Sequence, residues 1–421
     1  MPAAEMTPAQ PTPTTGRTPW AMVCAWAAFL ACSWTWCIGM FLPVLIARDF
    51  GPLGFWAFAL PNVIGAAAMG WILSRRSSQE LVDAHRPAAT AFSLVTIAFH
   101  MMFVAWLLAD AWYTPWVPIA ALSVLLVLTA AFTAMPARVQ AAAAAVVTLA
   151  TAVIAVGLLW LGSMDSVPSA EAQSRLLQLR HPPGHTLPLA AVCVLGFALC
   201  PYLDLTFHRA RAQTGRVAGP LAFSLGFGVL FFGFILLTSA YRGVFLWGDH
   251  TLGVLLLAHI LVQAAYTLGV HIRACAEQSC DRPIHPAGLT GVVLLIAGIL
   301  VAWPLGKALG PIDAVAHLHR GMRLGELVYR GFMGFYGLIF PAYVWLCVIP
   351  ARGRGFAAPT RARLVALGLS VAAAAPCYWL GFFRGEMWWL LAGVAIVLVA
   401  RPVAGLHLLL MARRGTLHAA A

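Results

Sequence analysis

Residues able to do chemistry are concentrated in the segment Cys193–Arg211, whose central part reads GFALCPYLDLTFHRA. The segment is apolar enough to lie in a membrane, yet it contains Gly196, Pro201 and Asp204. A helix that only spans lipid needs neither a helix breaker nor a carboxylate, since a charge at the bilayer centre costs about 2.5–3.5 kcal/mol on insertion scales. The segment therefore indicates an interrupted membrane helix with a function at the interruption.

The carboxylate of this segment has a titratable neighbour. His208 lies one helical turn after Asp204, on the same face. We expect these two residues to bind a coupling ion, relay a proton or act as a gate; Asp204 could also hold a cationic group of the substrate. The alternative is structural: Asp204 lies near the cytoplasmic mouth and only pairs with His208 or Arg209.

A second interruption occurs earlier in the chain, where Cys37–Pro43 reads CIGMFLP. Proline has no N–H to donate, so it frees the carbonyl four residues before it, and glycine adds backbone freedom. Two interrupted hydrophobic helices in corresponding halves of a chain are typical of a transporter binding site, although either break alone can be a simple kink. The predicted substrate contacts at the breaks are Gly39, Phe41, Pro43, Gly196, Cys200 and Pro201.

Polar side chains follow one face of two further apolar segments, 89–110 and 251–271. The first carries Ser93, Thr96 and His100, and the second carries His259, Gln263 and Thr267. Polar groups inside a membrane face the bundle interior, where they line pathways or hold helices together by hydrogen bonds. We add His100, His259 and Gln263 to the predicted substrate site.

The composition is that of an integral membrane protein. Of the 421 residues, 62% are hydrophobic and 10% are charged, whereas about a quarter of the residues of a soluble domain are charged. The net charge of +12 comes from arginines in predicted loops, so it does not indicate a nucleic-acid partner.

No phosphate-binding or hydrolase motif is present, and we expect neither an enzyme nor a cofactor. The spacing of Cys275, Cys280 and His285 departs from zinc-knuckle patterns, so no metal site is predicted.

A membrane helix needs about 20 mostly apolar residues, and the chain contains about twelve such segments. They are 20–47, 51–74, 89–110, 114–135, 141–162, 188–207, 220–241, 251–271, 289–310, 327–349, 363–383 and 387–409. Every loop after an even-numbered helix contains arginine, which places these loops and both termini in the cytoplasm. We expect a multi-pass protein of the cell (inner or plasma) membrane.

The longest polar connection between predicted helices divides the chain after five of them. With five helices in a unit, the next unit begins on the opposite side of the membrane, so two such units are inverted. The predicted domains are a disordered cytoplasmic tail (1–19), a first five-helix repeat (20–162), an outer loop (163–187), a second repeat (188–349) and two extra helices with a short tail (350–421).

This organisation resembles the amino acid–polyamine–organocation superfamily of secondary transporters, which share the LeuT-type fold, and distantly the sodium:solute symporters. The resemblance is strongest in SWTWCIGMFLPVLIARDFG and LGFALCPYLDLTFHRA. It implies broken first and sixth helices around a substrate, flanked by the third and eighth. Sodium-coupled members place small hydroxyl residues on the eighth helix, where this chain has His259, Gln263 and Thr267. Coupling to Na⁺ or to H⁺ therefore stays open.

We expect an ion-coupled transporter of a small organic solute that works by alternating access, in a lipid bilayer and with an oligomeric state that the sequence does not give. One alternative is a membrane haem or redox protein that uses His100, His259 or His271 as ligands. Others are a membrane transferase that uses Asp204 and His208, and a sensory relative that does not transport.

Overall fold

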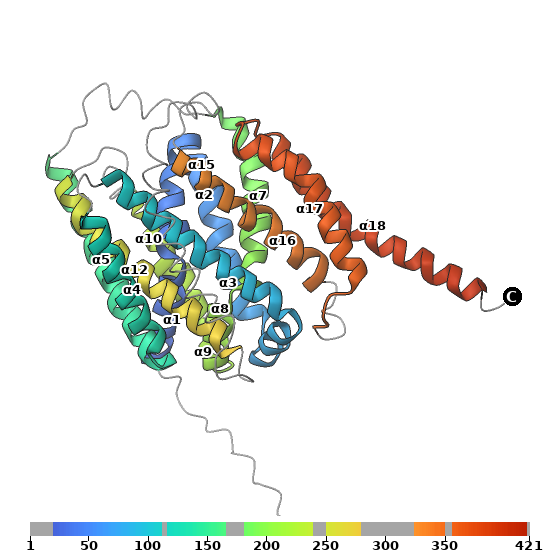
Figure 1. The fold of residues 1–421 in the computed structure, drawn as a ribbon, viewed down its shortest axis with the longest axis horizontal. Coiled ribbons are helices and arrows are strands. Elements are labelled where there is room, and N and C mark those ends of the chain that lie inside the picture. The colour runs from blue at the N-terminus through green and yellow to red at the C-terminus, as the bar shows by residue number, and fades with distance from the viewer. Residues whose placement is uncertain are drawn as a thin grey trace, which may run out of the picture.

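The computed structural model describes residues 20–111, 116–165, 181–238, 250–278, 324–349 and 356–418, and the regular structure in these ranges is helical. Figure 1 shows the helices packed side by side as a bundle. Within these ranges, eight helices are long and apolar enough to cross a membrane. The predicted all-α polytopic membrane class is confirmed, while the predicted helix 289–310 lies outside the described residues.

The chain crosses the bundle twice in its first helical stretch, Trp20–Ile72. This stretch consists of α1 (Trp20–Trp34), the π-helix η1 (Thr35–Met40) and α2 (Phe41–Ile72). The chain reverses direction at Gly51, whose φ of 69° and ψ of −159° lie outside the helical region. A side chain rarely adopts a positive φ, so glycine allows this reversal with little strain. The two predicted helices meet within a few residues of the expected boundary.

Most remaining elements follow the predicted apolar segments, with short π- and 3₁₀-helical pieces inserted into several of them. The remaining elements are α3 (Arg75–Ala111), α4 (Trp116–Ala134), α5 (Ala137–Asp165), η2 (Pro183–His185), α7 (Thr186–Leu199), η3 (Cys200–Leu203), α8 (Leu205–Gln213), α9 (Ala218–Leu225), η4 (Gly226–Phe231), α10 (Phe232–Leu236), α12 (His250–Glu277), α15 (Leu324–Gly334), η5 (Phe335–Ile339), α16 (Phe340–Tyr343), η6 (Val344–Val348), α17 (Arg361–Phe382) and α18 (Trp389–His418). Helix α3 begins at Arg75, well before the predicted start at 89, and its backbone is non-helical at His85.

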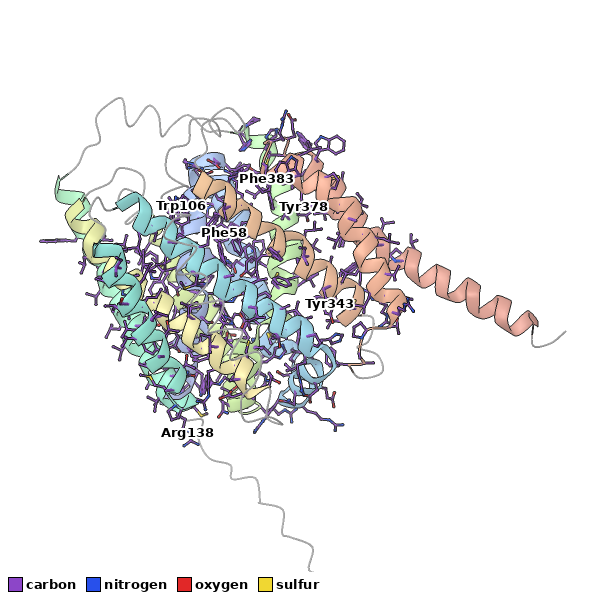
Figure 2. All side chains as sticks on the ribbon, viewed as in Figure 1. Phe58, Trp106, Arg138, Tyr343, Tyr378 and Phe383 are labelled. Atoms are coloured by element: carbon purple, nitrogen blue, oxygen red, sulfur yellow. The ribbon has the colours of Figure 1, made fainter. Side chains whose placement is uncertain are left out.

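The two ends of the bundle can be named from Figure 2, in which Phe383 lies at one end and Arg138 at the other. Between them the interior is filled with buried aromatic and aliphatic side chains. The outer surface of α4 and α5 is also apolar, with Val127 69% and Leu149 66% exposed. Apolar surface of this kind along whole helices fits a lipid environment.

The last two helices, α17 and α18, form an antiparallel hairpin at the side of the bundle (Figure 1). Helix α18 also packs against α7. This pair corresponds to the two extra helices that the sequence predicts. The predicted boundaries of the two five-helix repeats stay predictions, because one helix of the second repeat lies outside the described residues.

Candidate functional site

The first predicted break is a real departure from α-helical geometry. Trp34 has a φ of −121° and a ψ of 4°, and the π-helix η1 follows it. The N–H of Phe41 donates to the carbonyl of Trp36, five residues back rather than four. The wider turn coincides with Gly39 and with Pro43, whose ring cannot donate to the carbonyl of Gly39.

The second break is more severe, because the helix stops and starts again. Helix α7 tightens into η3, Asp204 is extended with a φ of −77° and a ψ of 108°, and α8 begins at Leu205. Asp204 caps α8: its Oδ1 accepts from the N–H of Thr206 at 2.8 Å and from the Thr206 hydroxyl at 2.6 Å. Asp is among the preferred N-cap residues, because its carboxylate satisfies N–H groups at the start of the helix. Pro201 therefore explains why the helix stops, and Asp204 explains why a new helix begins at Leu205.

The two broken helices meet at their breaks. The indole N–H of Trp34 donates to Oδ2 of Asp204 at 2.7 Å. The Trp34 ring lies 5.2 Å from that of Phe207 and 6.4 Å from that of Phe197, between centroids. Asp204 is fully buried. Its hydrogen-bond partners are Trp34 and Thr206, so the structural alternative of a pairing with His208 or Arg209 is not realised. The role of Asp204 as an ion or gate residue near the cytoplasmic mouth stays a prediction.

The returning part of α2 covers the second break through a glycine. A Cβ at Gly65 would lie 2.1 Å from the carbonyl oxygen of Phe197, which is the carbonyl that Pro201 leaves without its usual helical donor. Only glycine permits this approach of α2 to α7. The stretch of small residues that begins at Gly65 therefore lets α2 pack directly against the interrupted helix α7.

The other residues predicted at the breaks hold neighbouring helices. A Cβ at Gly39 would lie 2.1 Å from the ring of Phe231, so this glycine admits η4 to the first break. The ring of Phe41 packs 5.3 Å from that of Tyr329. The thiol of Cys200 donates to the carbonyl of Tyr336 at 3.2 Å. Pro43 and Pro201 are buried.

The polar stripes of α3 and α12 face other helices and form separate hydrogen bonds. Gln263 donates to the Cys32 carbonyl, and the His259 ring lies 2.7 Å from the Thr151 hydroxyl. His100 bonds the carbonyl of Thr96 in its own helix at 2.8 Å.

His271, the other residue of the haem alternative, bonds Ser93 at 3.1 Å. His208 joins Ser78 at 2.7 Å and the carbonyl of Tyr202 at 3.0 Å. The hydrogen-bonding alternative for the stripes is thus realised, and the role of these residues in substrate binding stays a prediction.

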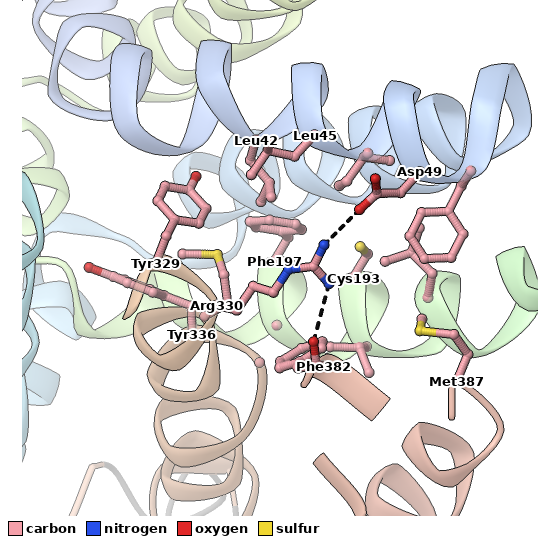
Figure 3. A pocket seen from close by; sticks show the side chains of 17 residues that line it. Leu42, Leu45, Asp49, Cys193, Phe197, Tyr329, Arg330, Tyr336, Phe382 and Met387 are labelled. Atoms are coloured by element: carbon pink, nitrogen blue, oxygen red, sulfur yellow. Dashed lines mark hydrogen bonds and ion pairs between the residues drawn. The ribbon is translucent and has the colours of Figure 1, made fainter. Parts of the chain in front are cut away.

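A cavity of about 100 Å³ lies between α2, α7, α15 and the α17–α18 turn. Figure 3 shows its lining side chains, which include Leu42 and Leu45 from α2 and Cys193 and Phe197 from α7. Of the predicted contacts, Gly196 lines it, whereas Gly39, Phe41, Pro43, Cys200, Pro201, His100, His259 and Gln263 do not. The predicted site residues do not include Tyr329 of α15 and Tyr336 of η5, whose rings form an aromatic wall of the cavity.

A network of four charged side chains lies at the Phe383 end of this cavity. Arg48 pairs with Asp49 at 2.7 Å and with Glu326 at 2.8 Å, and Arg330 pairs with the same two carboxylates at 2.7 and 2.8 Å. Arg330 also donates to the carbonyl of Phe382 at 3.1 Å. The network ties α2, α15 and α17 together. Asp49 and Glu326 are 2% and 5% exposed, although both lie just outside the predicted apolar segments.

A second polar network joins helices at the Arg138 end. Arg209 of α8 pairs with Glu277 of α12 at 2.9 Å and donates to Gln140 of α5. Arg273 pairs with the same Glu277 at 2.8 Å. Arg209 and its neighbour Arg211 are buried, although the sequence predicts them in a basic loop. The reason is that α8 continues to Gln213 and packs its arginines against carbonyls and the acid of neighbouring elements.

Comparison with known proteins adds a likeness in structure. No protein-family model and no curated protein matches the chain. The chain is similar to the solved structure of Mhp1, a nucleobase-cation-symport-1 family transporter, in a closed conformation with bromovinylhydantoin bound. The identity is 12% and the TM-score 0.45, over 93% of this chain and 94% of that chain. Likeness at this level does not assign a substrate or an ion.

Proposed function

We propose that the protein is a secondary transporter that moves a small organic solute across the membrane by alternating access. The observation that carries this proposal is the junction at Trp34 and Asp204, where two interrupted helices meet in the bundle interior. An uninterrupted helix moves as one rod, whereas the halves of a broken helix can tilt separately about the break. Such a junction lets one end of the bundle open while the other stays closed.

The charged networks at the two ends support the same function. Arg48, Asp49, Glu326 and Arg330 join helices at the Phe383 end, and Arg209 and Glu277 join helices at the Arg138 end. Both networks are made in the described conformation, and we propose that they hold it closed at both ends. We propose that each network breaks in turn, and that the Phe383 end faces outward because the arginine-rich loops predict a cytoplasmic Arg138 end.

The coupling ion is best supported as a proton. Carbonyls at an interrupted helix can coordinate sodium, but near the first break two carbonyls already use one of their two lone pairs to accept a protein donor. Gln263 donates to the Cys32 carbonyl and the Tyr329 hydroxyl donates to that of Cys37. Uptake into liposomes should therefore follow an imposed pH gradient and persist without sodium; uptake that requires sodium would contradict this assignment.

The test of the transport function uses purified protein in liposomes and a panel of radiolabelled amines, amino acids, nucleobases and neutral aromatic compounds. We expect gradient-driven accumulation of at least one of them. Pro201→Ala restores an N–H donor at the second break and should abolish accumulation. Pro376→Ala, in the uninterrupted helix α17, should leave it intact. Full accumulation by the Pro201 variant, or none by the natural protein, would rule the proposal out.

A further inference from the structure

We propose that the cavity between α2, α7 and α15 binds an uncharged, largely apolar ring compound and excludes amino acids, amines and carboxylates. This inference names the solute class of the proposed transporter and rests on that function only for the step of transport. Binding to the cavity can be measured without it.

The walls of the cavity offer apolar contacts on every side that the structure describes. Helix α2 contributes Leu42 and Leu45, α7 contributes Val192 and Cys193, and Met333 and Met387 face them from the other side. Methionine and cysteine sulfur atoms are polarisable and pack well against aromatic rings.

The charged groups of the lining are already paired. Among the described lining residues, only Asp49 and Arg330 carry charge. They pair with each other at 2.7 Å and belong to the network of two arginines and two carboxylates. Its formal charges cancel, so a solute ion would have to break an existing pair to gain a partner (Figure 3).

The polar atoms of the aromatic wall are also occupied. The Tyr329 hydroxyl donates to the Cys37 carbonyl, and the Tyr336 hydroxyl lies 3.0 Å from the Thr96 hydroxyl. Both tyrosines therefore give the cavity their rings. The carbonyl of Gly337 accepts from Tyr378 at 2.8 Å.

The same holds for Asp204, the buried carboxylate nearest to the two breaks. Its oxygens accept bonds from Trp34 and Thr206, and it is not among the residues that line the cavity, so a solute in the cavity does not reach it. A buried charge without a partner is strongly disfavoured, whereas an uncharged ring gains from leaving water. The site therefore selects against charge.

The experiment compares indole with three charged compounds built on the same ring: tryptamine, indole-3-acetate and tryptophan. Binding to the purified full-length protein is measured by isothermal titration calorimetry and by ligand-dependent thermal unfolding. Indole should bind, and each charged compound should bind at least about 100-fold more weakly, because it brings an unpaired charge into an apolar cavity. Comparable binding of any charged compound, or no binding of indole, would overturn the inference.

The location is tested with substitutions on one helix. Leu189→Trp and the milder Cys193→Met fill the cavity and should each weaken indole binding about tenfold or more. Val194→Trp lies on the same helix, but its side chain is 53% exposed on the outer surface, and binding should be unchanged. Unchanged binding in both filled variants would place the indole site elsewhere. If indole binds as described but is not accumulated by liposomes, the transport function fails while the solute class stands.

Discussion

At Asp204 a single carboxylate accepts hydrogen bonds from two separate transmembrane segments. One oxygen caps α8 through Thr206, and the other holds Trp34 of α1. The residue type is conspicuous in the sequence, because an acid inside an apolar run is rare. Its partner Trp34 is not conspicuous in the sequence, because it lies 170 residues earlier and tryptophan is common in this chain. Sequence reasoning therefore located the residue but not its partner Trp34.

The substitution Asp204→Asn should lower the free energy of unfolding by about 1–3 kcal/mol, because the new amide N–H₂ must face either Trp34 or Thr206, both donors. Trp34→Phe should have a cost of similar size, and the double variant should cost less than the sum of the two. Denaturant titration in detergent gives these values.

Asp83→Asn is the control, since the Asp83 side chain is 52% exposed and its substitution should change stability by less than about 0.5 kcal/mol. Additive effects would show that the two side chains do not interact.

At the scale of elements, the bundle depends on close approach at the interrupted helices. Proline, glycine and the acid predict both breaks correctly, because these residue types act on their own backbone. The partners across each break depend on which helices become neighbours. The sequence gives no such information for Phe231 against Gly39 or for Tyr329 against Phe41.

Gly65→Ala tests the approach of α2 to α7. The added methyl group would lie 2.1 Å from the Phe197 carbonyl oxygen, so the helices must separate, at a cost of about 1–3 kcal/mol. A lower thermal unfolding temperature should follow. Gly157→Ala in α5 is the matched control, because nothing lies within 4 Å of a Cβ there. This control should be neutral or stabilise by up to about 1 kcal/mol; equal losses in both variants would argue against a special contact at Gly65.

For the whole molecule, the sequence predicts the helical membrane class and most helix positions from apolar length alone. It does not predict the cavity, whose walls come from segments near residues 45, 193 and 333. Nor does it predict the network above the cavity, because Asp49 and Glu326 stand at the ends of apolar runs, where acids usually face water. Asp49 and Glu326 become buried only because α2, α15 and α17 pack against one another, and the sequence does not give that packing.

Glu326→Gln should open the Phe383 end. It removes a carboxylate that faces both Arg48 and Arg330, and the loss of one partner of a buried ion pair costs about 3–5 kcal/mol. Because the substitution destabilises the closed conformation, a water-soluble maleimide should label Cys193 at least about tenfold faster. Mass spectrometry of the labelled peptide measures this rate. Glu80→Gln removes a partner from the exposed pair with Arg76 and should leave the rate unchanged. An unchanged rate in the Glu326 variant would show that the network does not control access.

The π-helical pieces have a consequence for how this chain can change over generations. Among the described residues, η1, η4, η5 and η6 each widen a helix locally, and such a turn accommodates one residue more than an α-turn. Loss of a single residue there would restore an ordinary turn, and the residues on either side would keep the faces they already present, because the wider turn had absorbed the extra residue. In η5 (Phe335–Ile339), such a loss would change only the side chains of the turn itself, next to the cavity-lining Tyr336, while both helix ends stay in place. One-residue insertions and deletions at these turns are therefore a short route from one solute preference to another.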